Sequence, residues 1–198
     1  MKKLYFVTFL CLAILVSAQV PNFKLNAKID KSILPRILSP KETCLYFFHD
    51  NGFSAYDDIY YCFFNSINGI ELYKETRLKE YLNKEKKEKS KIEKIKIPES
   101  KKNELRGILR SSKLKNLLNY TQKDLDFKLS KGKPLPCMIA DAPDYKIIVM
   151  QAGKQSAYHF YAPDYYLNQC NDKSIINEKV LKLFDALVTQ LNLVYKEF

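Results

Sequence analysis

Five short runs of the chain carry the apolar and aromatic residues typical of β-strands, at 43–49, 59–67, 70–76, 145–151 and 155–161. Asn68-Gly69 separates the second run from the third. Because both of these residues tolerate a positive φ, they favour the two-residue turn of a β-hairpin. Residues 152–154 separate the last two runs in the same way, so the sequence predicts two hairpins.

The C-terminal part of the chain follows a helical period instead. Its apolar residues fall on one stripe, made by Ile176, Val180, Leu183, Phe184, Leu187, Leu191 and Val194. The stripe predicts a long amphipathic helix that begins after a cap at Ser174. Shorter helices are expected from Ser100 onward, over 113–118 and over 164–169, where Pro163 suits the first helical position.

These elements predict an α+β fold for a single domain, residues 19–198. An antiparallel sheet of about five or six strands, built from two hairpins, would carry the helices on one face, including the long C-terminal amphipathic helix. A further short strand is expected over 92–97, before Pro98. Residues 119–144 form a connection that is long for a compact domain, so it is either functional or contains an element that the pattern does not reveal.

Residues 1–18 have the three-part pattern of a secretory signal peptide. Two lysines precede an apolar run of 13 residues, and small residues follow at 16–18. The run is too short for an ordinary membrane span, and no later stretch is apolar enough for one. We therefore expect a secreted or periplasmic protein that begins near Gln19 and has no transmembrane segment. The alternative is an uncleaved N-terminal anchor.

The positive charge of the chain is concentrated in one segment. The formal net charge is +11, and residues 74–102 contain twelve basic and six acidic residues. This excess could attract a polyanion or an anionic membrane surface. The alternative is a solvated Lys/Glu-rich surface, because only four of the 33 basic residues are arginine. The segment 77–96 could be a mobile insertion, with either one short helix or a longer hairpin strand followed by a charged loop.

Four cysteines follow the predicted cleavage point: Cys44, Cys62, Cys137 and Cys170. An even number in an exported chain indicates two disulfides. We favour Cys44–Cys62 and Cys137–Cys170, because each pair lies within one local part of the chain. No pair has the close spacing of a zinc site, and neither histidine is spaced as a ligand, so we predict no metal site and no cofactor.

One group of residues around the second hairpin could carry chemistry. The tetrapeptide Ala-Pro-Asp-Tyr occurs at 142–145 and at 162–165, at the two ends of this hairpin. In an antiparallel pair these ends meet, so Asp144 and Asp164 could come close enough to bind a cation or share acid–base work. The alternative is a purely structural role, in which Ala-Pro-Asp ends a strand and caps a turn or helix.

His159 lies near Asp141 and Asp144 in the expected hairpin register. A histidine beside an aspartate can act as a general base, and Ser156 is close in sequence. No nucleophile at a diagnostic spacing completes the set, so these three residues are weak candidates for catalysis.

A dense aromatic cluster marks the same end of the hairpin, with Tyr158, Phe160, Tyr161, Tyr165 and Tyr166. If it is exposed, it would suit a carbohydrate, peptide or protein partner, since tyrosine offers both area and a hydroxyl group. Strand alternation favours a division instead, with Tyr158 and Phe160 in the core. The remaining tyrosines would then cover the edge of the sheet.

The sequence lacks the common catalytic motifs, including G-x-S-x-G, H-E-x-x-H and the glycine-rich phosphate loops. The first hypothesis is therefore a small exported binding or accessory protein without enzymatic activity, which contacts an unknown protein, small molecule or carbohydrate through Tyr158, Tyr161, Asp164, Tyr165 and Tyr166. The second is an extracytoplasmic hydrolase that uses Asp141, Asp144 and His159. The third is a binder of polyanions or anionic membrane surfaces through the basic segment.

Overall fold

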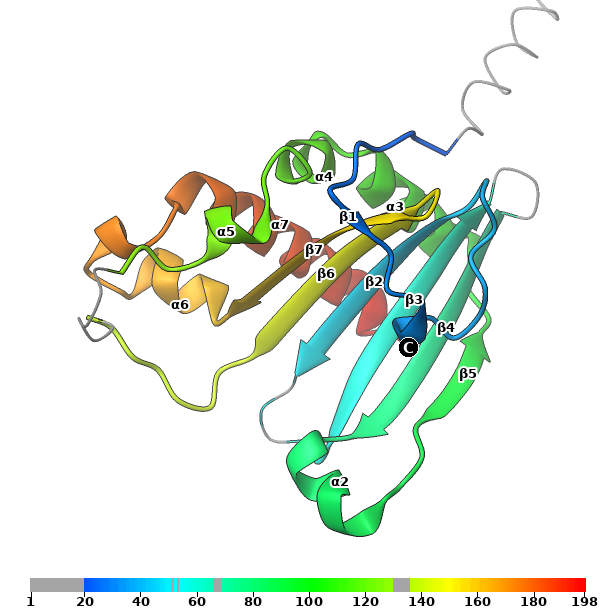
Figure 1. The fold of residues 1–198 in the computed structure, drawn as a ribbon, viewed down its shortest axis with the longest axis horizontal. Coiled ribbons are helices and arrows are strands. Elements are labelled where there is room, and N and C mark those ends of the chain that lie inside the picture. The colour runs from blue at the N-terminus through cyan, green and yellow to red at the C-terminus, as the bar shows by residue number, and fades with distance from the viewer. Residues whose placement is uncertain (1–19, 51, 53, 66–68, 130–135) are drawn as a thin grey trace, which may run out of the picture.

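The computed structural model describes residues 20–50, 52, 54–65, 69–129 and 136–198, and it contains a seven-stranded antiparallel sheet in the order β1-β7-β6-β2-β3-β4-β5 (Figure 1). The strands are β1 (Ala27–Lys28), β2 (Thr43–Asp50), β3 (Tyr56–Asn65), β4 (Gly69–Leu78), β5 (Lys91–Ile95), β6 (Asp144–Gln151) and β7 (Lys154–Tyr161). The α+β prediction is confirmed. The seventh strand is β1, which is only two residues long and has no apolar pattern by which the sequence could reveal it.

Both predicted hairpins are present. In the first, β3 and β4 pair with Asn65 opposite Gly69, whose φ is +78°. Residues 66–68, and with them Asn68 of the predicted turn, lie outside the described residues. In the second, Ala152 (φ +50°) and Gly153 (φ +76°) connect β6 to β7. Two successive residues with positive φ match the twist of the strands that they join.

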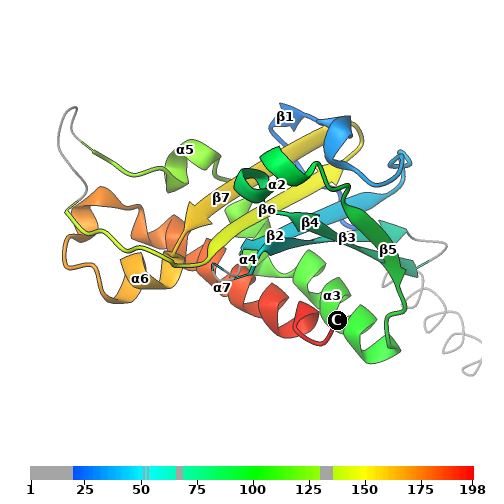
Figure 2. The ribbon, with the colours of Figure 1, turned by 90° about the horizontal axis from the view of Figure 1, so that it is seen from below.

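The two hairpins are joined through β2, which pairs with β6 on one side and β3 on the other. Leu45 lies opposite both Val149 and Cys62, and Phe47 lies opposite Ile147. Because side chains alternate along a strand, these residues share one face of the sheet. That face carries the helices, as Figure 2 shows, and the predicted one-sided arrangement is confirmed.

The helices are α2 (Glu80–Lys86), α3 (Glu99–Arg110), α4 (Ser112–Leu117), α5 (Gln122–Leu125), α6 (Pro163–Asn168) and α7 (Glu178–Tyr195), with short 3-10 turns η1 (Lys31–Ile33) and η2 (Lys173–Ile175). Ser100 lies within the first turn of α3 and does not cap it. Ser174 does not cap α7 either, because Asp172 caps η2 there and α7 begins four residues later. The connection 119–144 does contain an unrevealed element, since Thr121 and Asp124 form a capping box for α5.

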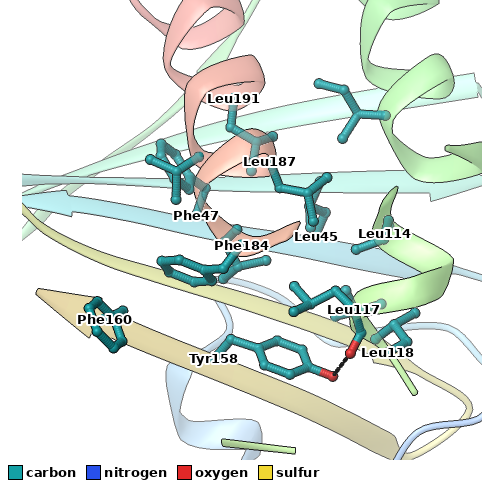
Figure 3. Close-up of a cluster of buried hydrophobic side chains, with 14 of the residues drawn as sticks. Leu45, Phe47, Leu114, Leu117, Leu118, Tyr158, Phe160, Phe184, Leu187 and Leu191 are labelled. Carbon is teal, nitrogen blue, oxygen red and sulfur yellow. Dashed lines mark hydrogen bonds between the residues drawn. The ribbon is translucent and has the colours of Figure 1, made fainter. Parts of the chain in front are cut away.

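The main core lies between the helices and the sheet. Figure 3 shows Phe184, Leu187 and Leu191 of α7 against Leu45 and Phe47 of β2, and all five are at most 1% exposed. Each fully buried leucine or phenylalanine contributes about 1.5–3 kcal/mol relative to an exposed position. The apolar stripe read from the sequence therefore fixes which side of α7 faces the sheet.

We call the opposite face of the sheet the back face; it is the face turned toward the viewer in Figure 1. The N-terminal segment crosses it and covers part of it. Ile29, Ile33, Leu34 and Leu38 from this segment pack on a second buried cluster that includes Tyr46. Arg36 anchors the segment by an ion pair with Glu42 and by placing its guanidinium 3.8 Å from the ring centroid of Phe63. This N-terminal segment is thus part of the fold.

The basic segment 77–96 combines the two structural alternatives. β4 continues to Leu78, α2 follows, and β5 then pairs with β4 as the last strand of the sheet. Several of its lysines are in ion pairs, including Lys79 with Asp50 and Lys94 with Glu71. The segment is therefore built into the sheet, whatever its role on the surface.

One of the two predicted disulfides is present, and the prediction of the other is wrong. Cys137 and Cys170 are bonded, as favoured. Cys44 and Cys62 are free and completely buried. Cys44 lies opposite Phe63, and Cys62 lies opposite Leu45, so the two cysteines are one position out of step and point to opposite faces of the sheet.

The predicted signal peptide, residues 1–18, lies outside the described residues. Among the residues that the structure does describe, no helix has both the length and the apolar character needed to cross a membrane.

Candidate functional site

The sheet register brings together two of the three residues predicted for catalysis. Asp144 in β6 and His159 in β7 lie on the back face, where His159 Nε2 is 2.7 Å and 2.8 Å from the two carboxylate oxygens. The hydrogen bond with Asp144 raises the pKa of His159. The pair therefore favours the protonated imidazole, although about half of the imidazole is exposed to solvent.

The other residues of that hypothesis do not join the pair. Asp141 is exposed and occupies a turn with φ +55°. Ser156 lies three residues before His159 on the same strand, so it points to the opposite face, where it is buried and accepts a hydrogen bond from the Asn26 backbone N–H. Asp164 accepts a hydrogen bond from Asn168 within α6, and no described contact connects it to Asp144. His159 could therefore act as a base, but none of these candidate residues lies beside it as a nucleophile.

Tyr158 lies in the core, as strand alternation favours, and not on a binding surface. It is 1% exposed, and its hydroxyl donates to the backbone carbonyls of Leu117 and Tyr120 at 3.1 Å and 2.9 Å. Figure 3 shows the first of these bonds. The side chain therefore joins β7 to the end of α4 and has no area left for a ligand.

The other three tyrosines bind the chain's own loop. Tyr165 and Tyr166 donate hydroxyl hydrogen bonds to the carbonyls of Met138 and Cys137, and the Tyr161 hydroxyl accepts from the Ala142 N–H at 2.8 Å. The Cys137–Cys170 disulfide fastens the same segment to the end of α6. The aromatic density seen in the sequence is thus explained by the attachment of residues 137–142.

A pocket that the sequence did not indicate lies on the helix-covered face, where α7 ends. It has a volume of about 480 Å³, within the range of small-molecule sites, and we call it the sheet–helix pocket. β2, β3 and β4 contribute Phe47, His49, Asp58, Tyr60 and Lys74. α7 and the residues after it contribute Asn192, Tyr195, Lys196 and Phe198.

A row of stacked rings forms the inner side of this pocket. The ring centroids of Tyr60 and Tyr195 are 4.4 Å apart, and the two ring planes are nearly parallel. Tyr195 also stacks on Phe47, with 5.7 Å between the ring centroids. Tyr145 continues the row beyond Phe47 and stacks on His49 at 4.8 Å. Such contacts add about 0.5–1.5 kcal/mol each beyond area burial, so they hold the inner side of the pocket rigid. Phe47, Tyr60 and Tyr195 are at most 7% exposed.

Charged groups lie at the β4 side of the row. Lys74 forms an ion pair with Asp58 at 3.1 Å, and its ammonium is 5.5 Å from the ring centroid of Tyr60. Burial opposes its charge, but the hydrogen bond to Asp58 raises the pKa of Lys74. Burial lowers the pKa of His49, which favours a neutral imidazole able both to donate and to accept. Lys196 adds a second cation on the helix side.

The residues of this pocket come from segments already recognised in the sequence, but only the strand register shows that they lie side by side. Phe47 lies opposite Tyr60, and Tyr60 lies opposite Lys74, so three residues from three strands form one row. In the sequence, Phe47 and Tyr60 belong to apolar runs, and Lys74 belongs both to such a run and to the basic stretch 74–102. Tyr195 closes the row from a helix that begins more than a hundred residues later, and that contact depends on packing alone.

Comparison of the chain with protein-family models and with curated proteins finds no match. Within the described residues, no group of three or more histidine, cysteine, aspartate or glutamate side chains is arranged to hold a metal ion.

Proposed function

We propose that this chain is an exported binding protein that holds a small organic ligand in the sheet–helix pocket. The observation that carries the proposal is the row of Tyr60, Tyr195 and Phe47 rings that ends at the Lys74 ammonium. The aromatic inner side of the pocket suits a ring that meets it in edge contact, and the lysine beside it suits an acidic group. The ligand class is therefore a ring-bearing carboxylic acid.

Export is part of the proposal and rests on two features. Residues 1–18 have the composition of a cleavable signal, and the Cys137–Cys170 disulfide is of a kind that persists in oxidising compartments. Binding without catalysis is supported by the composition of the pocket, whose described lining residues include no serine, threonine or cysteine as a nucleophile.

The test is an amide chemical-shift screen on the isotope-labelled protein, with benzoate, indole-3-acetate and glucuronate as probes. We expect a binding probe to shift the amides of His49, Asp58, Lys74 and Asn192. Lys74→Met should weaken that binding about tenfold or more, the scale of one charge-assisted hydrogen bond. Lys94→Met is the matched control, because Lys94 also forms a strand-to-strand ion pair but lies outside the pocket.

The same spectra separate the competing hypotheses. Shifts confined to residues 161–166 would return the binding surface to the aromatic end of the second hairpin. Salt-sensitive shifts at Lys91 and Lys94 on addition of heparin would favour the polyanion hypothesis. Either result, or the absence of any shift at the sheet–helix pocket, would overturn the proposed site.

A further inference from the structure

A second pocket lies on the back face of the sheet, where β3 and β4 meet α2. Its volume is about 590 Å³. Phe48 and Leu78 give it apolar lining, and polar lining comes from Asp57, Arg77, Glu80, Asn83 and Lys84. Because Asp57 and Asp58 are consecutive in β3, this pocket and the sheet–helix pocket open on opposite faces of the same strand.

The carboxylate of Asp57 is the unusual group in this pocket. The residue is 8% exposed, and its Oδ1 is buried without a hydrogen-bond partner. A buried carboxylate oxygen that lacks a partner is costly, and native structures retain few such groups. Burial, followed by the nearby negative charges of Asp50 and Asp144, raises the pKa of Asp57, while Lys79 and Arg77 oppose that shift.

Among the described residues, neither Lys79 nor Arg77 pairs with this carboxylate. The ammonium of Lys79 is held by Asp50 and by the carbonyl of Gly52. Arg77 lies directly opposite Asp57 in the β3–β4 register, yet no ion pair or hydrogen bond joins them. The strands thus place an acid and a base side by side in the lining of one pocket, the acid buried and the base exposed.

We propose that this pocket binds an α-amino acid with an apolar side chain. The ammonium group of the ligand lies on the Asp57 carboxylate, and its carboxylate lies on the exposed Arg77 guanidinium. Arg77 offers the planar fork that pairs with carboxylates. The apolar side chain of the ligand packs against Phe48 and Leu78. A ligand with both charges satisfies the acid and the base together, which neither an amine nor a carboxylic acid does alone.

The experiment is a calorimetric titration of the purified chain with L-leucine, leucinamide and 4-methylpentanoate. The last two keep the apolar side chain but present only the ammonium or only the carboxylate. We expect leucine to bind, and each of the other two to bind at least about tenfold more weakly, because each loses one charge-assisted contact. Asp57→Asn should weaken leucine binding to a similar extent.

A control keeps the result specific to this pocket. Lys94→Gln removes a cation from the next strand on the same face and should leave leucine binding unchanged. If Asp57→Asn fails to fold, Arg77→Gln decides, because Arg77 is exposed and its replacement leaves the core intact.

Three outcomes overturn the proposal. The first is no heat of binding for leucine at concentrations up to about 10 mM, beyond which affinity is too weak to be specific. The second is leucine binding that neither Asp57→Asn nor Arg77→Gln weakens. The third is equal binding of leucine and leucinamide, which would leave no role for the Arg77 guanidinium. None of these outcomes bears on the sheet–helix pocket, which is tested with other probes and variants.

Discussion

His49 and His159 lie on opposite faces of the sheet and in opposite electrostatic environments. His49 stacks on Tyr145 at the sheet–helix pocket, and burial lowers its pKa. His159 is bound to Asp144 on the back face, and this hydrogen bond raises its pKa. The chain has only these two histidines, so their ring resonances can be assigned with one substitution, His159→Gln.

We therefore predict that an NMR titration will find one imidazole with a pKa above about 6.5 and one below it. The folded-state pKa of His159 is raised, so its stabilising contribution is complete below about pH 6.5 and is lost as the pH rises through the folded value. The pKa of His49 is shifted in the opposite direction, so its contribution to stability is present above about pH 6.5 and is lost as the pH falls below that value. If both rings titrate at the same pH, or if Asp144→Asn leaves the higher value unchanged, the Asp144–His159 pair is not formed in solution.

The next prediction concerns the thiols. In the chain from Gln19 onward, alkylation under denaturing conditions without reductant should modify two cysteines, Cys44 and Cys62. In the native protein both should resist the reagent, because burial raises their pKa well above that of a free thiol and excludes the reagent. Peptide mapping after reduction should then find Cys137 and Cys170 newly reactive.

Reduction of the Cys137–Cys170 bond should also lower stability. The bond closes a loop between residues 33 apart, which corresponds to about 2–4 kcal/mol. Urea unfolding of Cys137→Ser, compared with the parent, measures this directly. Rapid modification of Cys44 or Cys62 in the folded protein, or an unchanged unfolding midpoint after loss of the bond, would contradict the assignment.

Much of the fold could be predicted because it follows from local pattern. The hairpins were visible in the runs on either side of Gly69 and Gly153, and α7 in one apolar stripe. What the sequence could not reveal is set by register. A shift of one position between β2 and β3 decides that Cys44 and Cys62 face apart, and nothing local to either strand specifies that shift.

The candidate sites were less predictable for the same reason. The Asp144–His159 contact followed from the hairpin, where the two residues are close in register. The aromatic cluster left two interpretations open, because composition does not distinguish a tyrosine that faces solvent from one whose hydroxyl holds a loop, as Tyr166 does. The sheet–helix pocket needed residues from three strands and α7, and such long-range packing is not encoded in any one segment.

Tyr158→Phe should destabilise the protein by about 1–2 kcal/mol, measured by urea unfolding. The substitution keeps the ring in the core but removes the hydroxyl that donates to the Leu117 and Tyr120 carbonyls. Tyr81→Phe is the control, because Tyr81 is 66% exposed and its change should stay within about 0.5 kcal/mol. Equal stability of the two variants would mean that the Tyr158 hydroxyl does not join β7 to α4.

The last prediction concerns Asp57 and the pH dependence of folding. Because its folded-state pKa is raised, the carboxyl group favours the folded state most when it is protonated, and this contribution is lost as the pH rises through the folded value. Asp57→Asn keeps the shape and replaces a buried charge by a neutral amide, which costs less to bury. We expect the variant to be at least as stable as the parent at pH 7.

Asp58→Asn is the matched comparison, since it breaks the ion pair with Lys74 on the other face and should cost up to about 1 kcal/mol at pH 7. Urea unfolding at pH 4 and pH 7 separates the two effects, because only Asp57→Asn should reduce the loss of stability on raising the pH. A variant Asp57→Asn that is less stable than the parent at pH 7 by more than about 1 kcal/mol would show that the ionised carboxylate is already satisfied within the fold. In that event the back-face pocket would have no unpaired acid with which to hold the ammonium group of an amino acid.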